Sequence, residues 1–203
     1  GESGGQMGDA GRITTQGGFV AVVDDTAKPL GRVHAHHATI EAGSIKVGDT
    51  VHLSVDVDRR DRIRANHSAT HLLHAALRRV LGDHVQQKGS LVAPDYLRFD
   101  FAHGEALSAE QREEIETLVN RQILENAAVT TELMDMEAAK DAGAMALFGE
   151  KYDSEVRVLT MGSDGFSKEL CGGTHVRQTG DIGAFVVLGD SSSSSGHGAS
   201  GLT

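Results

Sequence analysis

The apolar pattern of this chain changes its period near residue 59, and this change constrains the fold more than any other feature of the sequence. Before it, Gly17 and Gly18 lead into a short apolar run at 19–23, and apolar and polar residues alternate in 31–36 and 51–57. A period of two is typical of half-buried strands. Residues 1–58 therefore predict a β-barrel-like subdomain, formed by a small antiparallel sheet or part of a barrel.

A helix is predicted over residues 59–81, where apolar and histidine side chains recur every three or four positions until Gly82. A capping box formed by Ser108 and Gln111 opens a second helix, which runs to about residue 126. Strands and helices are mixed without regular alternation, so the fold class is α+β, with a mixed α/β core over 59–189. Extended segments are predicted at 84–101, 129–133, 156–159 and 183–188, and Asp135 is predicted to cap a short helix that stops near Gly143.

The end of the chain has a different composition. Residues 190–203 include five consecutive serines from Ser191 to Ser195. Segments of such low complexity offer no apolar face to bury, so 190–203 is predicted to be a flexible or engineered tail without chemistry.

The charge balance argues against simple phosphate-driven nucleic-acid binding. The chain has 19 Lys and Arg against 29 Asp and Glu, a net charge of −10 with histidine neutral. Proteins that bind nucleic acid mainly through phosphates are normally basic, because released counterions drive the affinity. If this chain handles RNA, it must grip a short end or depend on a neighbouring domain. The basic run at 59–64 fits either an RNA contact or the solvated start of a helix.

Several features of the sequence bear on the compartment. A single cysteine cannot form an internal disulfide, which agrees with a reducing, cytoplasmic environment. No stretch approaches the ~20 apolar residues of a membrane span, and the N-terminus has no signal-peptide pattern. Because the chain also lacks an initiator methionine, we expect it to be a piece of a longer cytoplasmic protein.

Two histidines in the predicted helix form the first half of a candidate metal site. His67 and His71 are four residues apart, so their rings project from one helix face about one turn apart. Two imidazoles at this spacing can share one ion, although such pairs also arise by chance. His74 lies on the same face and competes as a ligand.

The second half is the run from Cys171 to His175. Two glycines after the thiol, Gly172 and Gly173, let the backbone bend so that Cys171 and His175 converge on one point. One thiolate and three imidazoles suit Zn²⁺ better than Mg²⁺ or Ca²⁺, which prefer oxygen ligands. The alternative for Cys171 is a small buried apolar residue, and the adjacent glycines and histidine argue against it. One Zn²⁺ bound by His67, His71, Cys171 and His175 is therefore predicted.

Other chemistries find little support in the sequence. His34, His36 and His37 are expected to be exposed strand histidines, since neither a cysteine nor a carboxylate is spaced to complete a second metal shell. Arg98 fits either a phosphate or ribose contact or a cross-strand ion pair. The sequence has no phosphate-cradling glycine loop followed by Lys-Ser or Lys-Thr, so an ATP site is not expected.

Several long motifs, in order, resemble one known family. They are Glu2–Gln6, Asn66–His74, Gln87–Ser90, Gly143–Tyr152 and Cys171–His175, and they span most of the chain. Together they resemble the editing domain of alanyl-tRNA synthetase, within the threonyl/alanyl-tRNA synthetase second additional domain superfamily, with part of the preceding β-barrel. After Leu188 the sequence departs from the pattern of that family, which continues through a basic Arg-Arg-Ile stretch.

The resemblance implies an aminoacyl-tRNA deacylase that hydrolyses the ester of Ser-tRNA(Ala) and Gly-tRNA(Ala), as part of an alanine-tRNA ligase whose aminoacylation domain this chain lacks. Its partners would be the 3′ end of alanine tRNA and the remaining domains of the synthetase. It assigns a substrate-binding or catalytic role to Thr70 and Gln87. Arg98, Lys88 and Arg64 are candidate contacts to the tRNA end.

Two alternatives are retained: a free-standing trans-editing deacylase of the same superfamily, and a structural zinc module that only binds RNA. Four protein ligands would make a closed shell, whereas a catalytic zinc usually keeps one position open for water. We therefore expect zinc to position the aminoacyl group while a nearby water attacks.

Overall fold

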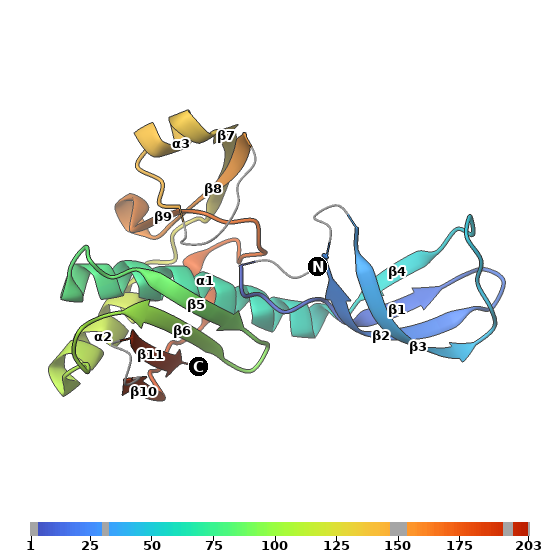
Figure 1. Ribbon diagram of the computed structural model, residues 1–203, viewed down its shortest axis with the longest axis horizontal. Helices are drawn as coiled ribbons and strands as arrows, with labels where there is room; N and C mark the ends of the chain where they lie inside the picture. The colour runs from blue at the N-terminus through green and yellow to red at the C-terminus, as the bar shows by residue number, and fades with distance from the viewer. Residues whose placement is uncertain (1–3, 30–32, 147–153, 193–196, 203) are drawn as a thin grey trace.

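The computed structural model describes residues 4–29, 33–146, 154–192 and 197–202 (Figure 1). Two long helices and three antiparallel sheets form most of this part of the chain, which agrees with the predicted α+β class. The strands are β1 Gly11–Thr14, β2 Val20–Ala27, β3 Ala35–Ala42, β4 His52–Val55, β5 Gln87–Val92, β6 Leu97–Ala102, β7 Thr130–Asp135, β8 Glu155–Met161, β9 Ser167–Leu170, β10 Gly189–Ser192 and β11 His197–Leu202. The helices are α1 Val57–Leu81, α2 Ala109–Glu125 and α3 Met136–Asp141, with short 3-10 turns at Ser163–Gly165 and Thr179–Ile182.

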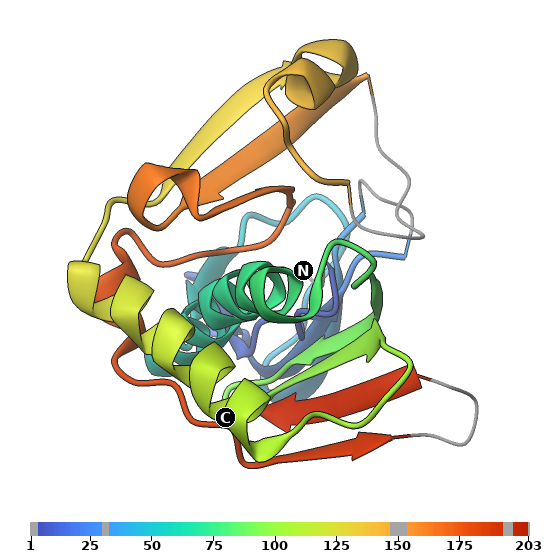
Figure 2. The same cartoon turned by 90° about the vertical axis from the view of Figure 1, so that its left-hand side faces the viewer.

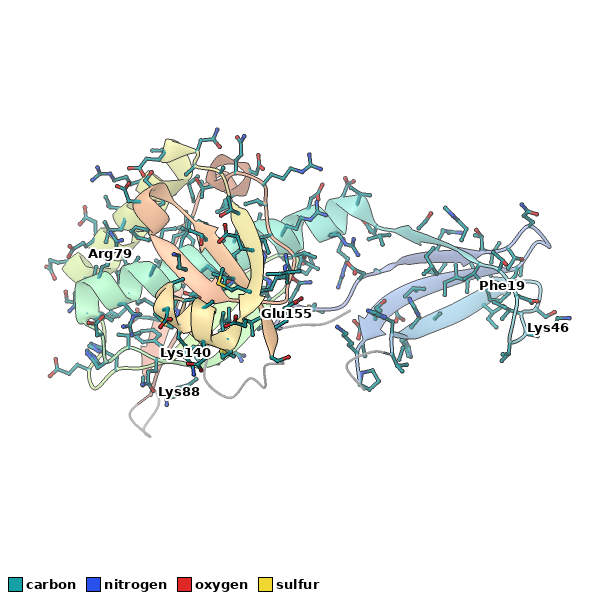
Figure 3. The ribbon with its side chains drawn as sticks, turned by 90° about the horizontal axis from the view of Figure 1, so that it is seen from above. Phe19, Lys46, Arg79, Lys88, Lys140 and Glu155 are labelled. Carbon is teal, nitrogen blue, oxygen red and sulfur yellow. The ribbon has the colours of Figure 1, made fainter. Side chains whose placement is uncertain are left out.

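The N-terminal strands form one open sheet in the order β3-β2-β1-β4, which projects from the rest of the molecule (Figure 1). Its strands were predicted to be barrel-like, but among the described residues the sheet does not close. The reason is that β3 and β4 lie at opposite edges, and every residue of β3 is exposed. Phe19 and, on β2 itself, Ala21 and Val23 have buried side chains. Phe19 and Lys46 lie near the end of this sheet that is farthest from the core (Figure 3).

Helix α1 connects this sheet to the core, and it runs through the middle of the core (Figures 1 and 2). It begins two residues before the predicted start, because the Asp56 side chain caps it by accepting a hydrogen bond from the Arg59 N–H at 2.9 Å. The Arg60 guanidinium pairs with Asp9 in the N-terminal segment at 2.8 Å. Although burial opposes ionisation, this guanidinium lowers the pKa of Asp9.

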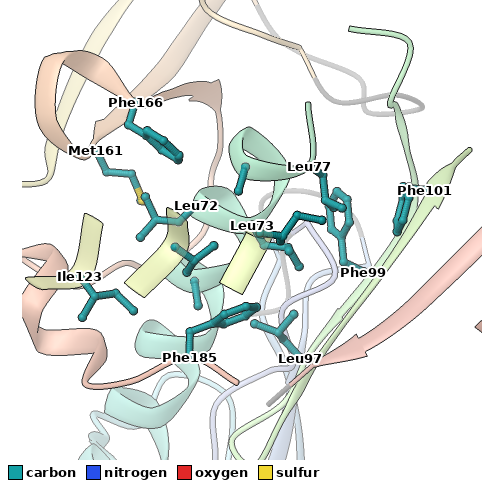
Figure 4. Close-up of a cluster of buried hydrophobic side chains, with 14 of the residues drawn as sticks. Leu72, Leu73, Leu77, Leu97, Phe99, Phe101, Ile123, Met161, Phe166 and Phe185 are labelled. Atoms are coloured by element: carbon teal, nitrogen blue, oxygen red, sulfur yellow. The ribbon is translucent and has the colours of Figure 1, made fainter. Parts of the chain in front are cut away.

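The main hydrophobic core lies where α1, α2 and the sheet β10-β11-β6-β5 meet (Figures 2 and 4). Leu72 and Leu73 of α1 are fully buried there, beside Phe99 of β6 and Ile123 of α2. The predicted capping box at the start of α2 is confirmed by both of its reciprocal hydrogen bonds. None of the described helices is long and apolar enough to cross a membrane.

A third sheet, β7-β8-β9, packs with α3 into a smaller cluster on the other side of α1 (Figure 1). Asp135 caps α3, as predicted, by accepting from the Ala138 N–H at 2.8 Å. Leu170 of β9 is buried in this cluster. Strand β9 therefore holds the segment that follows it, starting at Cys171, close to α1.

The strand predicted at 183–188 does not form. Its backbone instead bonds to side chains of α2: Asn120 Nδ2 donates to the Phe185 carbonyl at 2.7 Å, and Asn120 Oδ1 accepts from the Phe185 N–H at 2.9 Å. The Val187 N–H donates to Glu116 Oε2 at 2.8 Å. Since α2 satisfies these polar groups, the buried Phe185 anchors the segment without a neighbouring strand.

The tail predicted to be flexible also differs from expectation. Within 190–203, β11 pairs antiparallel with β6 along its whole length, and β10 pairs with β11. Main-chain groups make this ladder, so it requires no apolar pattern in the sequence. The side chain of Asp190 accepts a hydrogen bond from Arg112 at 2.9 Å, which ties the first of these strands to α2.

We expect Asn120→Ala to destabilise the fold by about 1–3 kcal/mol, because it leaves buried main-chain groups of Phe185 without partners. For a chain of this size the midpoint of thermal unfolding falls by about 2–4 °C per kcal/mol. Arg121→Ala is the matched control, since Arg121 is the neighbouring position on α2 and its exposed side chain pairs with Glu125 of the same helix. Equal midpoints for the two variants would contradict the anchoring role of Asn120.

Candidate metal centre

The first half of the candidate site lies on the buried face of α1. His67 and His71 are each 2% exposed, and their rings stack with centroids 5.1 Å apart. This is the arrangement that their four-residue spacing predicts on a helix. Both side chains point to the segment that follows β9.

The second half comes from residues 171–175, and glycine is required within it. A Cβ on Gly173 would lie 2.2 Å from Cε1 of the His67 ring, so only a residue without a side chain fits at this point. The Arg157 guanidinium donates to the Gly173 carbonyl at 2.8 Å. The Ser68 hydroxyl accepts from the Val176 N–H at 3.1 Å, which fixes the far end of the loop to α1.

The four predicted donors converge on one point. Cys171 Sγ lies 3.4 Å from His67 Nε2 and 3.5 Å from His175 Nε2, and His175 Nε2 lies 3.2 Å from His71 Nε2. All four donor atoms lie within 4.8 Å of one another. Zn–N bonds of about 2.0 Å and Zn–S bonds of about 2.3 Å place tetrahedral donors roughly 3.3–3.6 Å apart. The donor set therefore fits one zinc-sized ion.

Hydrogen bonds outside the cluster orient the rings. His67 Nδ1 lies 2.8 Å from Gln6 Oε1, and His71 Nδ1 lies 2.7 Å from Glu169 Oε2. Because these oxygens can only accept, each Nδ1 carries the hydrogen and each Nε2 faces the cluster. Gln6 Oε1 also accepts from the Thr174 N–H at 2.9 Å, so one amide joins the two halves of the site.

The electrostatics of the cluster favour a positive charge at its centre. Burial opposes the charge of His71, but the neighbouring Glu169 and Cys171 raise its pKa to about 10. Burial lowers the pKa of His175 to about 3. Burial also opposes the thiolate of Cys171, yet the charges of His67 and His71 hold its pKa well below the usual value. Without a metal, a proton on His71 supplies the positive charge that the thiolate and the Glu169 carboxylate attract.

Comparison with known proteins shows two kinds of similarity. Residues 156–199 match the profile of the threonyl and alanyl tRNA synthetase second additional domain. The chain is 63% identical over 203 residues to an alanine–tRNA ligase of Rhizorhabdus wittichii, covering 97% of this chain and 23% of the relative. It is 63% identical over 199 residues to that of Sphingopyxis alaskensis, covering 97% and 22%.

The chain is thus similar to one part of an alanine–tRNA ligase, and its residues 156–199 are similar to the second additional domain. It spans slightly less than a quarter of the length of the curated relatives it matches, 23% in the first case. The profile match runs through residue 199, past the departure from the family pattern that was predicted after Leu188.

His74 is not part of the four-donor group, although its spacing made it a competing ligand. Its Nδ1 lies 2.9 Å from Glu169 Oε1. His36 and His37 are exposed on β3, as predicted, and His37 pairs with Asp24 at 2.6 Å.

The family resemblance also assigned substrate binding or catalysis to Thr70, which lies on α1, and to Gln87, which begins β5. Thr70 is buried, and its hydroxyl donates to the Asn66 carbonyl at 2.8 Å. Gln87, at the start of β5, lines a cavity of about 210 Å³ that His74 also lines.

The three candidate tRNA contacts are spread over the surface. Arg64 pairs with Asp61 at 2.9 Å, and Arg98 pairs at 3.2 Å with Asp100 of the same strand. Lys88 is exposed on β5 and lies at the periphery of the molecule (Figure 3). Lys88 and Arg98 lie on the paired strands β5 and β6, and Arg64 lies on α1.

Sequence reasoning missed two residues that orient the site, Gln6 and Glu169. Gln6 was quoted only as part of a family motif, and it is 4% exposed. Glu169 is 3% exposed in the structure. In the sequence, the one signal for it was a carboxylate two residues before the Cys171–His175 motif. Their hydrogen bonds cross 61 and 98 residues of sequence, so spacing along the chain could not reveal them.

We expect the affinity of the chain for Zn²⁺ to rise with pH. With its pKa raised to about 10, metal-free His71 carries a proton on Nε2 at neutral pH, and binding must displace it. One displaced proton corresponds to about tenfold in apparent affinity per pH unit below about pH 10. Competition with a chromophoric chelator, at several pH values and corrected for the chelator's own protonation, measures this. A flat profile would contradict it.

We expect Gly173→Ala to weaken Zn²⁺ binding by at least about tenfold, because the added methyl displaces the His67 ring or the loop. Gly172→Ala is the matched control, since Gly172 is the exposed neighbour. Zinc content after dialysis, together with the far-UV spectrum, separates loss of metal from loss of fold. If both variants retain zinc equally, the close approach of residue 173 to the ring has no consequence for the site.

Proposed function

We propose that this chain is the editing part of an alanine–tRNA ligase and hydrolyses the ester of serine or glycine attached to alanine tRNA. The observation that carries the proposal is the convergence of His67, His71, Cys171 and His175 in a chain that aligns over 97% of its length with such a ligase. A cytoplasmic location follows from this role.

The chemistry of amino-acid selection explains why such a second site would be needed. A pocket shaped for alanine excludes glycine only through one lost methyl contact, and serine adds a single hydroxyl. Differences of this size limit discrimination to roughly 10–200-fold. A separate hydrolytic site that recognises the wrong amino acid restores accuracy, and this chain would supply it.

The donor set supports one Zn²⁺ held by His67, His71, Cys171 and His175, since a thiolate with three imidazoles suits zinc. When bound, the ion would supply a Lewis acid that holds the aminoacyl group. The chain's own residues keep it in place: Gln6 and Glu169 fix the Nδ1 hydrogens of two ligands.

Hydrolysis adds a water oxygen to the ester carbonyl carbon and breaks the bond to the ribose oxygen, which takes up a proton. We assign to Gln87 the orientation of the aminoacyl group, because it lines a cavity together with His74 and an amide both donates and accepts. The hydroxyl of Thr70 donates to its own helix, which leaves its oxygen lone pairs to accept from a substrate.

The tRNA would be bound by its 3′ end. With a net charge of −10, the chain has no general attraction for phosphates, so most of the affinity must come from the remaining domains of the synthetase. Arg64, Lys88 and Arg98 remain the proposed contacts to the RNA end.

Two other functions fit parts of the site. A free-standing trans-editing deacylase would have the same chemistry but no adenylate-forming domain in its reading frame, and the alignment with full-length ligases favours the first proposal. A purely structural zinc module would bind RNA without hydrolysing it. Taken by itself, the buried group of four donor atoms is compatible with a catalytic zinc site and with a structural one.

Deacylation of Ser-tRNA(Ala), with zinc content measured on the same samples, tests the proposal. We expect hydrolysis by the zinc-loaded chain, loss of activity by at least about 100-fold in His67→Ala, and loss on chelation. His52→Ala, which changes an exposed histidine of β4, is the matched control and should retain activity.

Two results would contradict this assignment. Full deacylation by Cys171→Ala with zinc still bound would remove Cys171 from the site. A folded, zinc-loaded wild-type chain that binds but does not hydrolyse the aminoacyl-tRNA would favour the structural module.

A further inference from the structure

Two buried histidine ring nitrogens, His74 Nε2 and His175 Nδ1, have no hydrogen-bond partner within the described residues, and only His74 lies outside the four-donor group. His74 is 2% exposed, and its Nε2 is buried without any hydrogen bond. Buried polar atoms are nearly always hydrogen-bonded, because an unpaired one costs about 1–3 kcal/mol. A ligand or a bound water that donates to this atom would remove that cost.

The ring of His74 is held firmly on its other sides. Its Nδ1 lies 2.9 Å from Glu169 Oε1, while the second oxygen of the same carboxylate lies 2.7 Å from Nδ1 of His71. The ring also packs against Phe99, with centroids 5.2 Å apart. Since the carboxylate accepts from Nδ1, the hydrogen of the neutral ring is on Nδ1 and Nε2 is an acceptor.

Glu169 therefore links two histidines with different surroundings. His71 belongs to the four-donor group, whereas His74 lies about one helical turn further along α1 and does not belong to it. Side chains three residues apart on a helix have Cβ atoms about 5–6 Å apart.

His74 also lines the cavity of about 210 Å³ at the start of β5. Its other polar lining comes from Gln86, Gln87 and Arg78, and its apolar lining from Val85, Met145 and Ala146. A small amino-acid side chain fits a space of this size. A cavity lined by an imidazole, two amides, a guanidinium and three apolar side chains suits a short side chain that ends in a hydroxyl.

We propose that His74 is a specificity-determining residue whose Nε2 accepts a hydrogen bond from the side-chain hydroxyl of a seryl ester in this cavity. The inference rests on the proposed deacylase function and extends it. A glycyl ester has no hydroxyl to donate, so it gains nothing from His74. The same residue therefore favours serine over glycine without contacting the metal.

The first test compares two substrates in one variant. His74→Asn keeps a donor near the Nδ1 position for Glu169 and removes Nε2. We expect hydrolysis of Ser-tRNA(Ala) to fall about tenfold relative to Gly-tRNA(Ala), which is the size of one lost hydrogen bond. Zinc content should stay unchanged. His52→Asn is the control and should leave the ratio of the two rates as in the wild type.

The second test needs neither hydrolysis nor a variant. In the zinc-loaded wild-type chain, the ¹⁵N resonance of His74 Nε2 is followed while an amide analogue of 3′-seryl-adenosine is added, and then the glycyl analogue. We expect the resonance to shift with the seryl analogue alone. His52 serves as the internal reference.

The outcomes separate the two proposals. If the wild type hydrolyses neither substrate, the deacylase function is wrong, and the resonance of His74 still decides whether this cavity recognises the hydroxyl. Equal losses for both substrates in His74→Asn, or an Nε2 resonance unmoved by the seryl analogue, would overturn the role of His74. In that case the atom holds only water.

Discussion

The structure depends on holding four electron-rich donor atoms within 4.8 Å of one another in a buried position. Lone pairs at this distance repel unless a positive charge lies among them. The fold provides the opposing restraint through hydrogen bonds from outside, with Gln6 on His67 and Glu169 on His71. These contacts join three separate parts of the chain: the N-terminal segment, helix α1 and the end of strand β9.

The hydrophobic core and this cluster use opposite sides of one helix. Leu72, Leu73 and Leu77 of α1 pack against β6 and α2, while His67 and His71 turn to the segment that follows β9. A helix buried on both sides has little freedom to move, which suits a site whose donors must be placed to within tenths of an ångström. The same rigidity fixes the ring of His74 beside its cavity.

Much of the local structure could be predicted because its causes are local. The helix through His67, the capping box at Ser108 and the cap at Asp135 depend on residues within one or two turns. Elements with distant causes were predicted incorrectly. The segment around Phe185 has the pattern of a strand, but Asn120 takes its hydrogen bonds, and the serine-rich end pairs with β6 through its main chain.

The identity and spacing of the four donors follow from the amino-acid sequence alone, because helical periodicity and two glycines suffice to bring each pair together. Family resemblance then linked the pairs and supplied a reaction. Tertiary packing was needed to show that Glu169 holds His71 and His74 with one carboxylate, and that His74 faces a cavity and not the metal donors. Hydrogen bonds between residues nearly one hundred positions apart leave no periodic trace in a sequence, whereas a helix repeats every few residues.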